Sequence, residues 1–279
     1  MATLSGKTAL ITGATDGVGR VVAKKLGALG ARLLVHGRDQ GRGAQVVAEI
    51  AAGGGQAEFL AADLAALAEV RRLADAVRAR TDRLNILINN AGIGTTGGGP
   101  GRQTSADGYE LRFAVNYLAG FLLTYLLLPL VIKSAPARIV NVSSAGQQAI
   151  DFADVMLSHG YSGGRAYCQS KLAQIMFTID LARELEGAHV TVNCLHPATY
   201  MNTTMVRQAG ITPWSSVEDG AEAILNLAVS PSIEGRSGLY FSGLREAHAN
   251  DQAYDAEARR RLHALSLELT GLSAKAAAG

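Results

Sequence analysis

The feature that most constrains this chain is a glycine-rich turn between its first apolar run and its first helical pattern. Residues Thr8 to Thr12 predict a short buried strand, and a helix is expected to begin near Val18. Glycine permits the tight turn between them and lets a pyrophosphate approach the backbone at the helix N-terminus. This placement predicts a dinucleotide-binding turn, with contacts from Gly13, Thr15, Asp16, Gly17, Val18 and Gly19.

The rest of the chain repeats this alternation of short apolar runs and helical patterns. Further strands are expected at Arg32 to His36, Ala57 to Ala61, Asn85 to Asn89, Arg138 to Val142 and Val190 to Leu195. Helices are expected near Val18–Leu29, Ala44–Ala52, Leu67–Arg80, Tyr109–Ile132 and Tyr167–Leu185. Because most of the strands are apolar on both faces, they fit a parallel sheet covered on two sides. The sequence therefore predicts an α/β fold: a doubly wound parallel (Rossmann) sheet of about seven strands with helices on both faces.

The loops and ends indicate the domain organisation. Since no composition break marks a second domain, residues 1–279 are expected to form a single dinucleotide-binding and catalytic domain. Gly53-Gly54-Gly55 and Gly97-Gly98-Gly99 are expected loops. Residues 268–279, rich in Ala, Gly and Ser, are expected to be a loose tail.

Composition narrows the class of protein. Of the 279 residues 48% are hydrophobic, and the net charge of +2 comes without a long run of one sign, which argues against nucleic acid and anionic membranes as partners. Met1 to Lys7 lacks the basic and apolar regions of a secretory signal. Cys168 and Cys194 form neither a disulfide framework nor a zinc pattern, so we expect no metal site and a cytoplasmic location. The longest apolar run, Leu118 to Ile132, is shorter than the ~18 to 20 residues that span a bilayer and predicts a buried helix.

The end of the second expected strand bears on the choice of cofactor. Many NAD sites carry an acid here that holds the ribose 2′-hydroxyl, but this chain has Gly37 followed by Arg38. A guanidinium suits a 2′-phosphate, so NADP(H) is favoured and NAD(H) stays open as the alternative. Asp39 follows directly, and Asp16 in the turn would oppose a nearby phosphate. A solvated loop charge is the competing interpretation of Arg38.

The ends of the third and fourth strands supply further candidate contacts. Asp63, followed by Leu64, could accept a hydrogen bond from the adenine amine, or it could cap the next helix. Asn90, Ala91 and Gly92 follow the fourth strand, and the small residues of this stretch would leave room for backbone beside the adenosine ribose. By itself, Asn-Asn-Ala-Gly indicates only a turn.

Polar residues in the second half of the chain predict the chemistry. Tyr167 and Lys171 share one helix face, so the ammonium can sit beneath the phenol and lower its pKa from the ordinary ~10. The pair is then a candidate acid/base for a substrate oxygen. Asn116 lies inside a strongly helical pattern, where an amide needs a bonding partner. Ser143 and Ser144 close the fifth strand, on the edge of the sheet where ligands bind. Each of these residues also has a structural interpretation. Tyr167 could be a half-buried tyrosine beside a solvated lysine, Asn116 a core amide bonded to a backbone carbonyl, and the two serines helix caps or loop residues.

In this order the motifs resemble the short-chain dehydrogenase/reductase family, over nearly the whole chain. The resemblance rests on Thr12-Gly13-x-x-x-Gly17-x-Gly19, Asn89-Asn90-Ala91-Gly92, Asn116, Ser144 and Tyr167-x-x-x-Lys171. It implies that Tyr167 is the general acid in carbonyl reduction, that Lys171 lowers the tyrosine pKa and binds the nicotinamide ribose, and that Ser144 binds the substrate oxygen. It also implies that Asn116 holds a water between Lys171 and solvent. Ser144 is preferred because the family places the catalytic serine just before a small-residue turn, here Ala145-Gly146.

A finer resemblance is to the retinol-dehydrogenase-like branch of the family. It rests on residues 104–110, 141–145, 166–173 and 269–272 and on the long segment between Ser144 and Tyr167. The resemblance implies that this insert, residues 145–166, forms part of the substrate-pocket wall and that residues 199–214 form a mobile lid. The membrane-bound retinol enzymes carry an N-terminal anchor that this chain lacks, so retinol is not implied as the substrate.

One position departs from the family pattern. After the sixth strand the family usually has Pro-Gly, and here it is Pro197-Ala198. The loop is implied to contact the nicotinamide through Pro197 and Thr199, with Asn202 or Thr203 reaching the carboxamide or the phosphates. Alanine is a small loss there unless the backbone needs φ > 0.

Residues and resemblance together imply an oxidoreductase of the CH–OH class. It would move a hydride between NADP(H) and the carbonyl or alcohol of a small hydrophobic substrate. An NAD-linked alcohol dehydrogenase and a non-catalytic nucleotide-sensing protein on the same fold are the alternatives. Apolar faces on the helices near Tyr109–Ile132 and Tyr167–Leu185 predict a homodimer or homotetramer.

Overall fold

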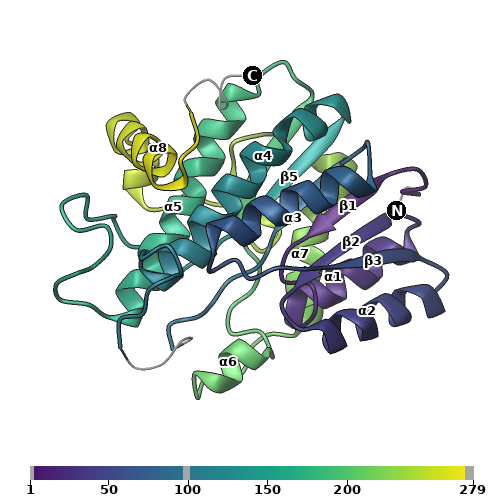
Figure 1. Ribbon diagram of the computed structural model, residues 1–279, viewed down its shortest axis with the longest axis horizontal. Helices are drawn as coiled ribbons and strands as arrows, with labels where there is room; N and C mark the ends of the chain where they lie inside the picture. Colours follow the sequence, from purple (N-terminus) through teal and green to yellow (C-terminus); the bar gives the residue numbers. More distant parts are fainter. Residues whose placement is uncertain (1–2, 97–100, 274–279) are drawn as a thin grey trace.

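The computed structural model describes residues 3–96 and 101–273, which are built around one eight-stranded sheet (Figure 1). The strands lie in the order β3-β2-β1-β4-β5-β6-β7-β8. Their bounds are β1 Thr8–Ile11, β2 Arg32–Gly37, β3 Gln56–Ala61, β4 Ile86–Asn89, β5 Ala137–Val142, β6 Val190–His196, β7 Tyr240–Ser242 and β8 Arg245–Glu246. The strands β1 to β7 pair in parallel, and β8 runs antiparallel to β7. The predicted doubly wound sheet is confirmed, with a strand count slightly above the expectation.

The sequence pattern misses β7 and β8 because strands of three and two residues are too short for a periodicity to stand out. Their position comes from pairing: Cys194 of β6 lies opposite Tyr240 of β7, and Phe241 of β7 lies opposite Glu246 of β8. The last strand thus closes one edge of the sheet with a short antiparallel ladder.

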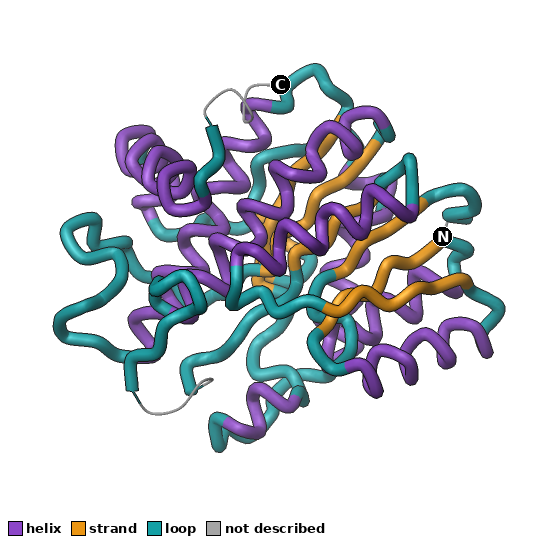
Figure 2. Tube along the Cα trace, in the orientation of Figure 1, coloured by secondary structure: helices purple, strands orange, loops and turns teal. Residues whose placement is uncertain are grey.

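Helices cover the sheet in two layers (Figures 1 and 2). One face carries α1 (Gly17–Ala28), α2 (Gln40–Ala52) and α7 (Val217–Val229). The other face carries α3 (Leu67–Arg80), α4 (Ala119–Lys133) and α5 (Gly163–Glu184). Successive strand residues point to opposite layers, so Leu10 belongs to the core beneath α3 to α5 and Ile11 to the core beneath α1 and α7.

The strand order positions a ligand-binding crevice. The chain moves outward from β1 to β3 and then returns to β4 on the other side of β1. The loops after β1 and β4 therefore diverge at the carboxyl edge and leave a crevice between them. Long loops and the short helix α6 (Thr204–Gln208) gather at this edge (Figure 2).

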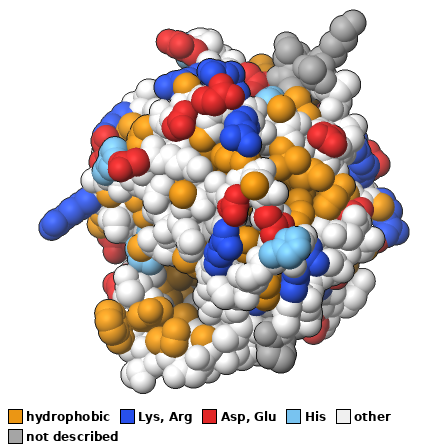
Figure 3. Space-filling model, turned by 90° about the vertical axis from the view of Figure 1, so that its left-hand side faces the viewer, with side chains coloured by type: hydrophobic (Ala, Val, Ile, Leu, Met, Phe, Trp, Pro, Cys, Tyr) orange, Lys and Arg blue, Asp and Glu red, His pale blue; other side chains and the backbone are white. Residues whose placement is uncertain are grey.

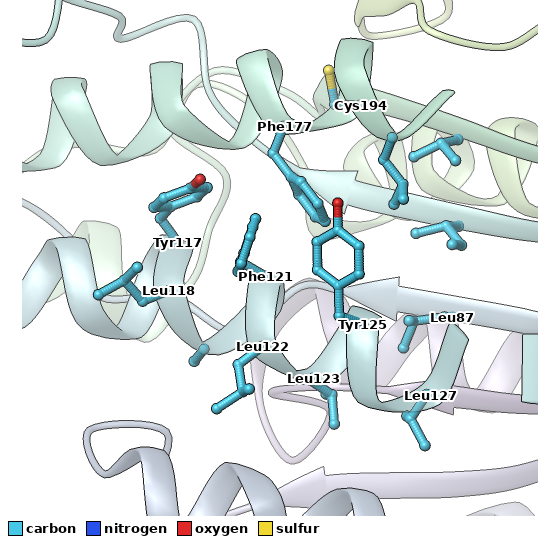
Figure 4. Packing of buried hydrophobic residues seen from close by; sticks show 14 of the residues in the cluster. Leu87, Tyr117, Leu118, Phe121, Leu122, Leu123, Tyr125, Leu127, Phe177 and Cys194 are labelled. Atoms are coloured by element: carbon cyan, nitrogen blue, oxygen red, sulfur yellow. The ribbon is translucent and has the colours of Figure 1, made fainter. Parts of the chain in front are cut away.

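Aromatic rings join α4 and α5 to the C-terminal helix α8 (Ala256–Thr270). The Phe121 ring of α4 lies 5.1 Å from the ring of Phe177 on α5 (Figure 4). The same Phe121 ring lies 5.9 Å from the His263 ring of α8. The C-terminal helix therefore covers apolar surface of α4 and α5 that the sequence analysis assigns to a partner subunit.

Helix α8 also corrects the expected loose tail over residues 268–279. The helix continues to Thr270, and Gly271 ends it in the left-handed conformation with φ of +64°. The Thr270 carbonyl accepts a hydrogen bond of 2.6 Å from Arg71. Residues 274–279 and the expected Gly97–Gly99 loop lie outside the described residues.

The central apolar helix is longer than the run seen in the sequence. A π-helical segment, η1 (Phe113–Leu118), and α4 form one helix of 21 residues that is long and apolar enough to cross a membrane by length and composition. The length argument against a membrane-spanning segment therefore does not hold. However, 67% of the tested stretch is buried inside the protein, and the core helix of a soluble protein passes the same test.

Candidate active site

The turn after β1 is shaped by glycine conformations and a capped helix. Gly13 and Gly17 have φ of +64° and +51°, in the region that residues with a Cβ avoid. The Asp16 carboxylate caps α1 by accepting a 2.7 Å hydrogen bond from the Gly17 N–H. A Cβ on Gly17 would project across the crevice to lie 3.3 Å from Thr203 Cγ2. Glycine at this position thus keeps the space above the turn open.

Asn90 and Thr12 fasten this turn to the loop after β4. Asn90 Nδ2 donates to the carbonyls of Thr12 and Gly13 at 2.9 and 3.0 Å. Thr12 Oγ1 accepts from the N–H groups of Asn90 and Ala91, both at 3.0 Å. A Cβ on Gly19 would lie 2.4 Å from both Asn90 Nδ2 and the Gly13 carbonyl oxygen. The structure brings these predicted residues together, with glycine required at position 19.

His36 supports the same turn from β2, although the sequence analysis does not select it. Its Nδ1 accepts from the Gly13 N–H at 3.2 Å, and its Nε2 lies 3.1 Å from the Ala62 carbonyl oxygen. An accepting Nδ1 requires the neutral ring with its proton on Nε2, which then donates to Ala62. Burial lowers the pKa of His36 to about 4 and keeps the ring neutral. In the sequence, the sign of such a role is a polar residue, His36, inside the otherwise apolar strand β2.

The carboxyl end of β2 carries two arginines. The Arg38 guanidinium is exposed and lies 4.0 Å from the Asp63 carboxylate. Arg42, in the first turn of α2, lies 3.5 Å from the Asp16 carboxylate. Arg42 therefore offsets the acid that opposes a phosphate at this turn. The spacing did not point to Arg42, because only the helix brings it back over the turn.

Asp63 and Leu64 follow β3 in different surroundings. Asp63 Oδ1 accepts from the Ala65 N–H at 3.0 Å, and its side chain is half exposed. Leu64 is buried in the core, so only its backbone can reach the crevice. Helix α3 is instead capped from a distance, because the Leu67 N–H donates to Asp107 Oδ2 at 2.9 Å. Asp63 thus stabilises a turn before α3 and keeps its carboxylate at the crevice.

Tyr167 and Lys171 lie together on α5, facing the end of β5. The Lys171 Nζ lies 5.7 Å from the centroid of the Tyr167 ring. It donates to the Val142 carbonyl and to Gln174 Oε1, both at 2.9 Å. The shared face predicted from the spacing is therefore present, and the sequence analysis did not foresee the Gln174 contact.

The pKa values of this pair differ from the expectation. Burial raises the pKa of Tyr167 above its ordinary value, and its hydrogen bond with Ser144 opposes this only in part. Burial also lowers the pKa of Lys171 to about 7. Removal from water disfavours the charged form of both groups. The expected net lowering of the Tyr167 pKa is not found, because burial outweighs the opposing effect of Ser144 and Lys171 is not among the groups that shift this pKa.

Ser144, and not Ser143, is the serine that meets Tyr167. Ser143 Oγ is buried and donates to the Lys171 carbonyl at 2.8 Å. Ser144 Oγ accepts from the Gly146 N–H at 3.1 Å and is hydrogen bonded to the Tyr167 phenol. A Cβ on Gly146 would lie 3.6 Å from both Ser144 Oγ and Tyr167 Cε1. The small-residue turn thus gives the two hydroxyls their common space.

Asn116 lies in the π-helical turn η1, and both ends of its amide are hydrogen bonded to protein. Its Oδ1 accepts from the Ile93 N–H at 2.8 Å, and its Nδ2 donates to the Ile93 carbonyl at 3.1 Å and to Ser170 Oγ at 3.0 Å. The side chain therefore fastens the loop after β4 to α5. Since an amide oxygen has two lone pairs and Oδ1 uses one of them, the water implied between Lys171 and solvent stays a prediction.

The segment after β6 begins with Pro197 and Thr199. Ala198 lies outside the left-handed region, so alanine is compatible with the backbone there. Thr199 Oγ1 lies 3.0 Å from His196 Nε2, and the Thr199 carbonyl accepts from Ser215 Oγ at 2.7 Å. Pro197 and Thr199 line a hollow of about 410 Å³ beside α7 and the β7–β8 turn.

Residues 199–214 form a strap across the carboxyl edge. At its base the Trp214 N–H donates to the Tyr200 carbonyl at 3.0 Å, and the two rings meet edge to face at 5.2 Å. At its far end, a Cβ on Gly94 would lie 2.9 Å from Met205 Cγ. The strap thus reaches from β6 over the phosphate turn to the loop after β4.

The insert, residues 145–166, is mostly loop, and its end already belongs to α5, which begins at Gly163. Buried Arg112 ties this loop to the loop after β4. Its guanidinium donates to the Tyr161 hydroxyl of the insert and to the Gly94 carbonyl, the latter at 2.9 Å. The two loops that flank the crevice are therefore held by one side chain.

One hollow lies far from these groups. It measures about 900 Å³ and opens at the amino-terminal edge of the sheet, beside Asn85, Arg138 and Val190. None of the predicted site residues lines it. Converging side chains, and not cavity size, therefore identify the site.

A glycine turn at the switch point of a doubly wound sheet, beside a tyrosine, a serine and a lysine, defines a class of dinucleotide-dependent oxidoreductases. The chain belongs to the short chain dehydrogenase family, whose profile matches residues 7–213. It falls in the retinol-dehydrogenase-like branch, and it is an oxidoreductase that acts on CH–OH groups.

The chain is similar to mouse retinol dehydrogenase 14, with 38% identity over 296 residues that cover 96% of this chain and 87% of the relative. It is 39% identical to mouse polyprenol dehydrogenase over 287 residues, which cover 95% and 84% of the two chains. Among solved structures, an uncharacterised Mycobacterium paratuberculosis protein matches with a TM-score of 0.79 and 30% identity over 97% of this chain and 96% of that chain. The NADP complex of Pseudomonas aeruginosa RhlG matches with a TM-score of 0.69 and 30% identity over 86% and 95%. These relatives support a nicotinamide cofactor.

Proposed function

We propose that the protein is an NADP(H)-dependent enzyme that interconverts a hydrophobic alcohol and its aldehyde or ketone. The observation that carries this proposal is the meeting of Tyr167, Ser144 and Lys171 at the edge of the crevice. Ser144 is hydrogen bonded to Tyr167, and the Lys171 Nζ lies 5.7 Å from the tyrosine ring. A nucleotide-sensing protein would not need this acid/base arrangement.

The proposed chemistry divides between cofactor and protein. The bound nicotinamide supplies the hydride. In the direction of reduction, the Tyr167 hydroxyl donates its proton to the carbonyl oxygen while Ser144 Oγ donates a hydrogen bond to the same oxygen. Burial raises the pKa of Tyr167 and so keeps it protonated at neutral pH, as a donor must be. The Lys171 ammonium stabilises the negative charge that develops on the phenol oxygen.

The residues at the crevice fit a dinucleotide. A Cβ on Gly17 would fill the space between the turn and the strap, and a Cβ on Gly92 would lie 3.5 Å from Lys171 Nζ. Both glycines leave room where a pyrophosphate and a ribose would lie. We assign the pyrophosphate to Gly13, Thr15, Asp16, Gly17, Val18 and Gly19, the adenosine to Arg38, Asp63, Leu64, Asn90, Ala91 and Gly92, and the nicotinamide riboside to Tyr167, Lys171, Pro197 and Thr199.

The surroundings of β2 support NADP(H) over NAD(H). A Cβ on Gly37 would lie 2.5 Å from Thr15 Cγ2, so an acid at this position would require Thr15 to move. The side chains of Arg38 and Arg42 are 69% and 58% exposed at the same edge. Two guanidiniums there suit a 2′-phosphate, and Arg42 offsets the charge of Asp16.

The cofactor preference is tested by titrating the protein with NADPH and NADH and following the reduced nicotinamide fluorescence. We expect tighter binding of NADPH and a reversed or flattened preference in Arg38→Asp. Arg72→Asp is the matched control, because Arg72 is a 71% exposed arginine of α3 whose ion pair is with Glu69 of the same helix. Tighter binding of NADH by the unmodified protein would favour the NAD-linked alternative.

The proposed hydrophobic substrate rests on the strap and on the relatives. Tyr200, Met205 and Trp214 are 41%, 40% and 75% exposed on the segment over the crevice. Gathered exposed apolar side chains often line ligand sites. The relatives are named as retinol and polyprenol dehydrogenases, whose substrates are hydrophobic alcohols.

Turnover is tested with all-trans-retinal, decanal and glyceraldehyde, followed by loss of NADPH absorbance. We expect reduction of the first two and little reduction of glyceraldehyde. Faster turnover of glyceraldehyde would contradict the hydrophobic substrate. A protein that binds NADPH and reduces none of a wider set of carbonyls would support the nucleotide-sensing alternative.

A single domain, a homodimer or homotetramer and a cytoplasmic location remain proposals from the sequence. Helix α8 covers apolar faces that motivated the assembly, and the helix Phe113–Lys133 passes the length test for a membrane span. Light scattering at micromolar concentration tests the oligomeric state, and separation of soluble from membrane fractions tests the cytoplasmic location. A monomer, or recovery with the membranes, would contradict them.

A further inference from the structure

Lys171 has a second side-chain neighbour besides Tyr167, the amide of Gln174. Its Nζ donates to Gln174 Oε1 at 2.9 Å, in addition to the Val142 carbonyl. Lys171 and Gln174 are 5% and 4% exposed, and they lie one turn apart on α5. The amide is thus built into the back of the site, on the side away from solvent.

We propose that Gln174 is a positioning residue, which holds the Lys171 ammonium in its charged form beside Tyr167; this rests on the function proposed above. An ammonium has three donors and no acceptor, so Gln174 must present its oxygen to it. The Val142 carbonyl and Gln174 Oε1 accept hydrogen bonds from two of the three N–H groups of the ammonium. The third N–H group remains for a hydrogen bond on the crevice side, where a Cβ on Gly92 would lie 3.5 Å from the Lys171 nitrogen.

A buried polar network holds the helix turn that carries Gln174, through the main-chain carbonyl of that residue. Thr178 Oγ1 donates to the Gln174 carbonyl at 2.8 Å, and Asn141 Nδ2 donates to Thr178 Oγ1 at 2.8 Å. Asn141 Oδ1 in turn accepts from Asn89 Nδ2 at 2.9 Å. These side chains are all buried, and such networks hold their members in one arrangement. The network joins β4 and β5 to the helix turn that carries Gln174.

The charge on Lys171 depends on these acceptors. In residues 3–96 and 101–273, the facing elements bring the Val142 carbonyl from β5, Gly92 from the loop after β4 and Asn116 from η1, none of which titrates. Its titratable neighbour is Tyr167 on its own helix. Burial lowers the pKa of Lys171 to about 7. One acceptor can therefore decide whether the amine is charged at neutral pH.

The experiment follows the Lys171 amine directly in the purified protein. The chain contains six lysines, so the NMR signals of lysine labelled with ¹³C at Cε can be assigned, with Lys171 identified by its loss in Lys171→Met. The pH titration of this signal is compared in four proteins: unmodified, Gln174→Leu, Gln174→Glu and Gln169→Leu. Gln169 is the matched control, because it is 2% exposed on the same helix and its amide has no partner in the described part of the chain.

We expect Gln174→Leu to lower the Lys171 pKa by about one unit, since a hydrogen bond to a charged group is lost. Gln174→Glu should raise the Lys171 pKa by adding a negative charge, and Gln169→Leu should leave it unchanged. If turnover is observed, the alkaline limb of NADPH-dependent reduction should move in the same directions, because the charged amine is lost as pH rises through its pKa.

A Lys171 pKa that stays within experimental error in both Gln174 variants would overturn the proposal. If Gln174→Leu does not fold, Gln174→Glu decides alone, because it keeps the size of the side chain. A moved Lys171 titration without turnover of any carbonyl would sustain the role of Gln174 as the lysine's partner and contradict the proposed function. Turnover of a carbonyl with an unmoved Lys171 titration would contradict only the role of Gln174.

Discussion

The two sides of the crevice are held together in different ways. On the cofactor side, backbone groups dominate: Asn90 binds the carbonyls of Thr12 and Gly13, and His36 binds the Gly13 N–H. On the substrate side, the strap has a backbone hydrogen bond at its base, from the Trp214 N–H to the Tyr200 carbonyl, but several of its side chains are exposed, among them Trp214 at 75%. Contacts to backbone leave little room for substitution, whereas exposed side chains can change at small cost. We therefore expect sequence changes on the cofactor side to affect folding and changes on the substrate side to affect selectivity.

The largest effect is expected where the two sides meet. Tyr167→Phe removes the proposed proton donor and should lower kcat by about 10²- to 10⁴-fold, the usual contribution of general acid catalysis. NADPH affinity, measured by fluorescence, should stay within about twofold because the ring and Lys171 remain. Activity close to that of the unmodified enzyme would remove Tyr167 from the chemistry.

The next largest effect is a loss of folding stability at low pH, caused by protonation of His36. Its pKa is lowered by burial from 6.5 to about 4, so the unfolded chain binds the proton more tightly than the folded protein. The stability that this group contributes is therefore fully present above pH 6.5 and is lost as pH falls toward 4, by about 3 kcal/mol in total.

Urea unfolding between pH 4 and 7 measures this loss. His36→Gln does not titrate and keeps a donor and an acceptor, so its stability should fall less over the same range. Equal pH profiles for the two proteins would show that His36 is not the group responsible.

The contrast between backbone and side-chain contacts is sharpened by two glycines. A Cβ on Gly19 would lie 2.4 Å from the Gly13 carbonyl oxygen, whereas a Cβ on Gly164 has nothing within 4 Å. Gly19→Ala should lower the free energy of unfolding by about 1 to 3 kcal/mol and weaken NADPH binding. Gly164→Ala, in the first turn of α5, should be neutral or stabilising by about 0.4 to 1 kcal/mol. Thermal unfolding with and without NADPH compares the two, and similar losses in both would contradict the close packing at Gly19.

The smallest effect on stability is expected in the strap. Trp214→Ala should change the free energy of unfolding by less than about 0.5 kcal/mol, because the side chain is mostly exposed. It should nevertheless raise KM for decanal more than for glyceraldehyde, with kcat nearly unchanged. A loss of stability comparable to that of Gly19→Ala would mean that the strap belongs to the folded core.

Local patterns were enough for much of the fold and part of the site. The apolar strands, the glycine-rich turn before the first helix and the shared helix face of Tyr167 and Lys171 all follow from short stretches of sequence, because turn geometry and helical spacing are local properties. The choice of Ser144 over Ser143 came from the family resemblance and stays a prediction; in the structure the Ser143 hydroxyl donates to the Lys171 carbonyl.

Other features depend on residues distant in the sequence, and only the tertiary structure decided them. Arg42 reaches Asp16 only once α2 is in place, and α8 covers helices that the sequence left without a partner. The pKa of Tyr167 is the clearest case: spacing indicates a charge nearby, but the net direction depends on how much water the whole fold removes. Burial is a property of the assembled chain, and no local pattern contains it.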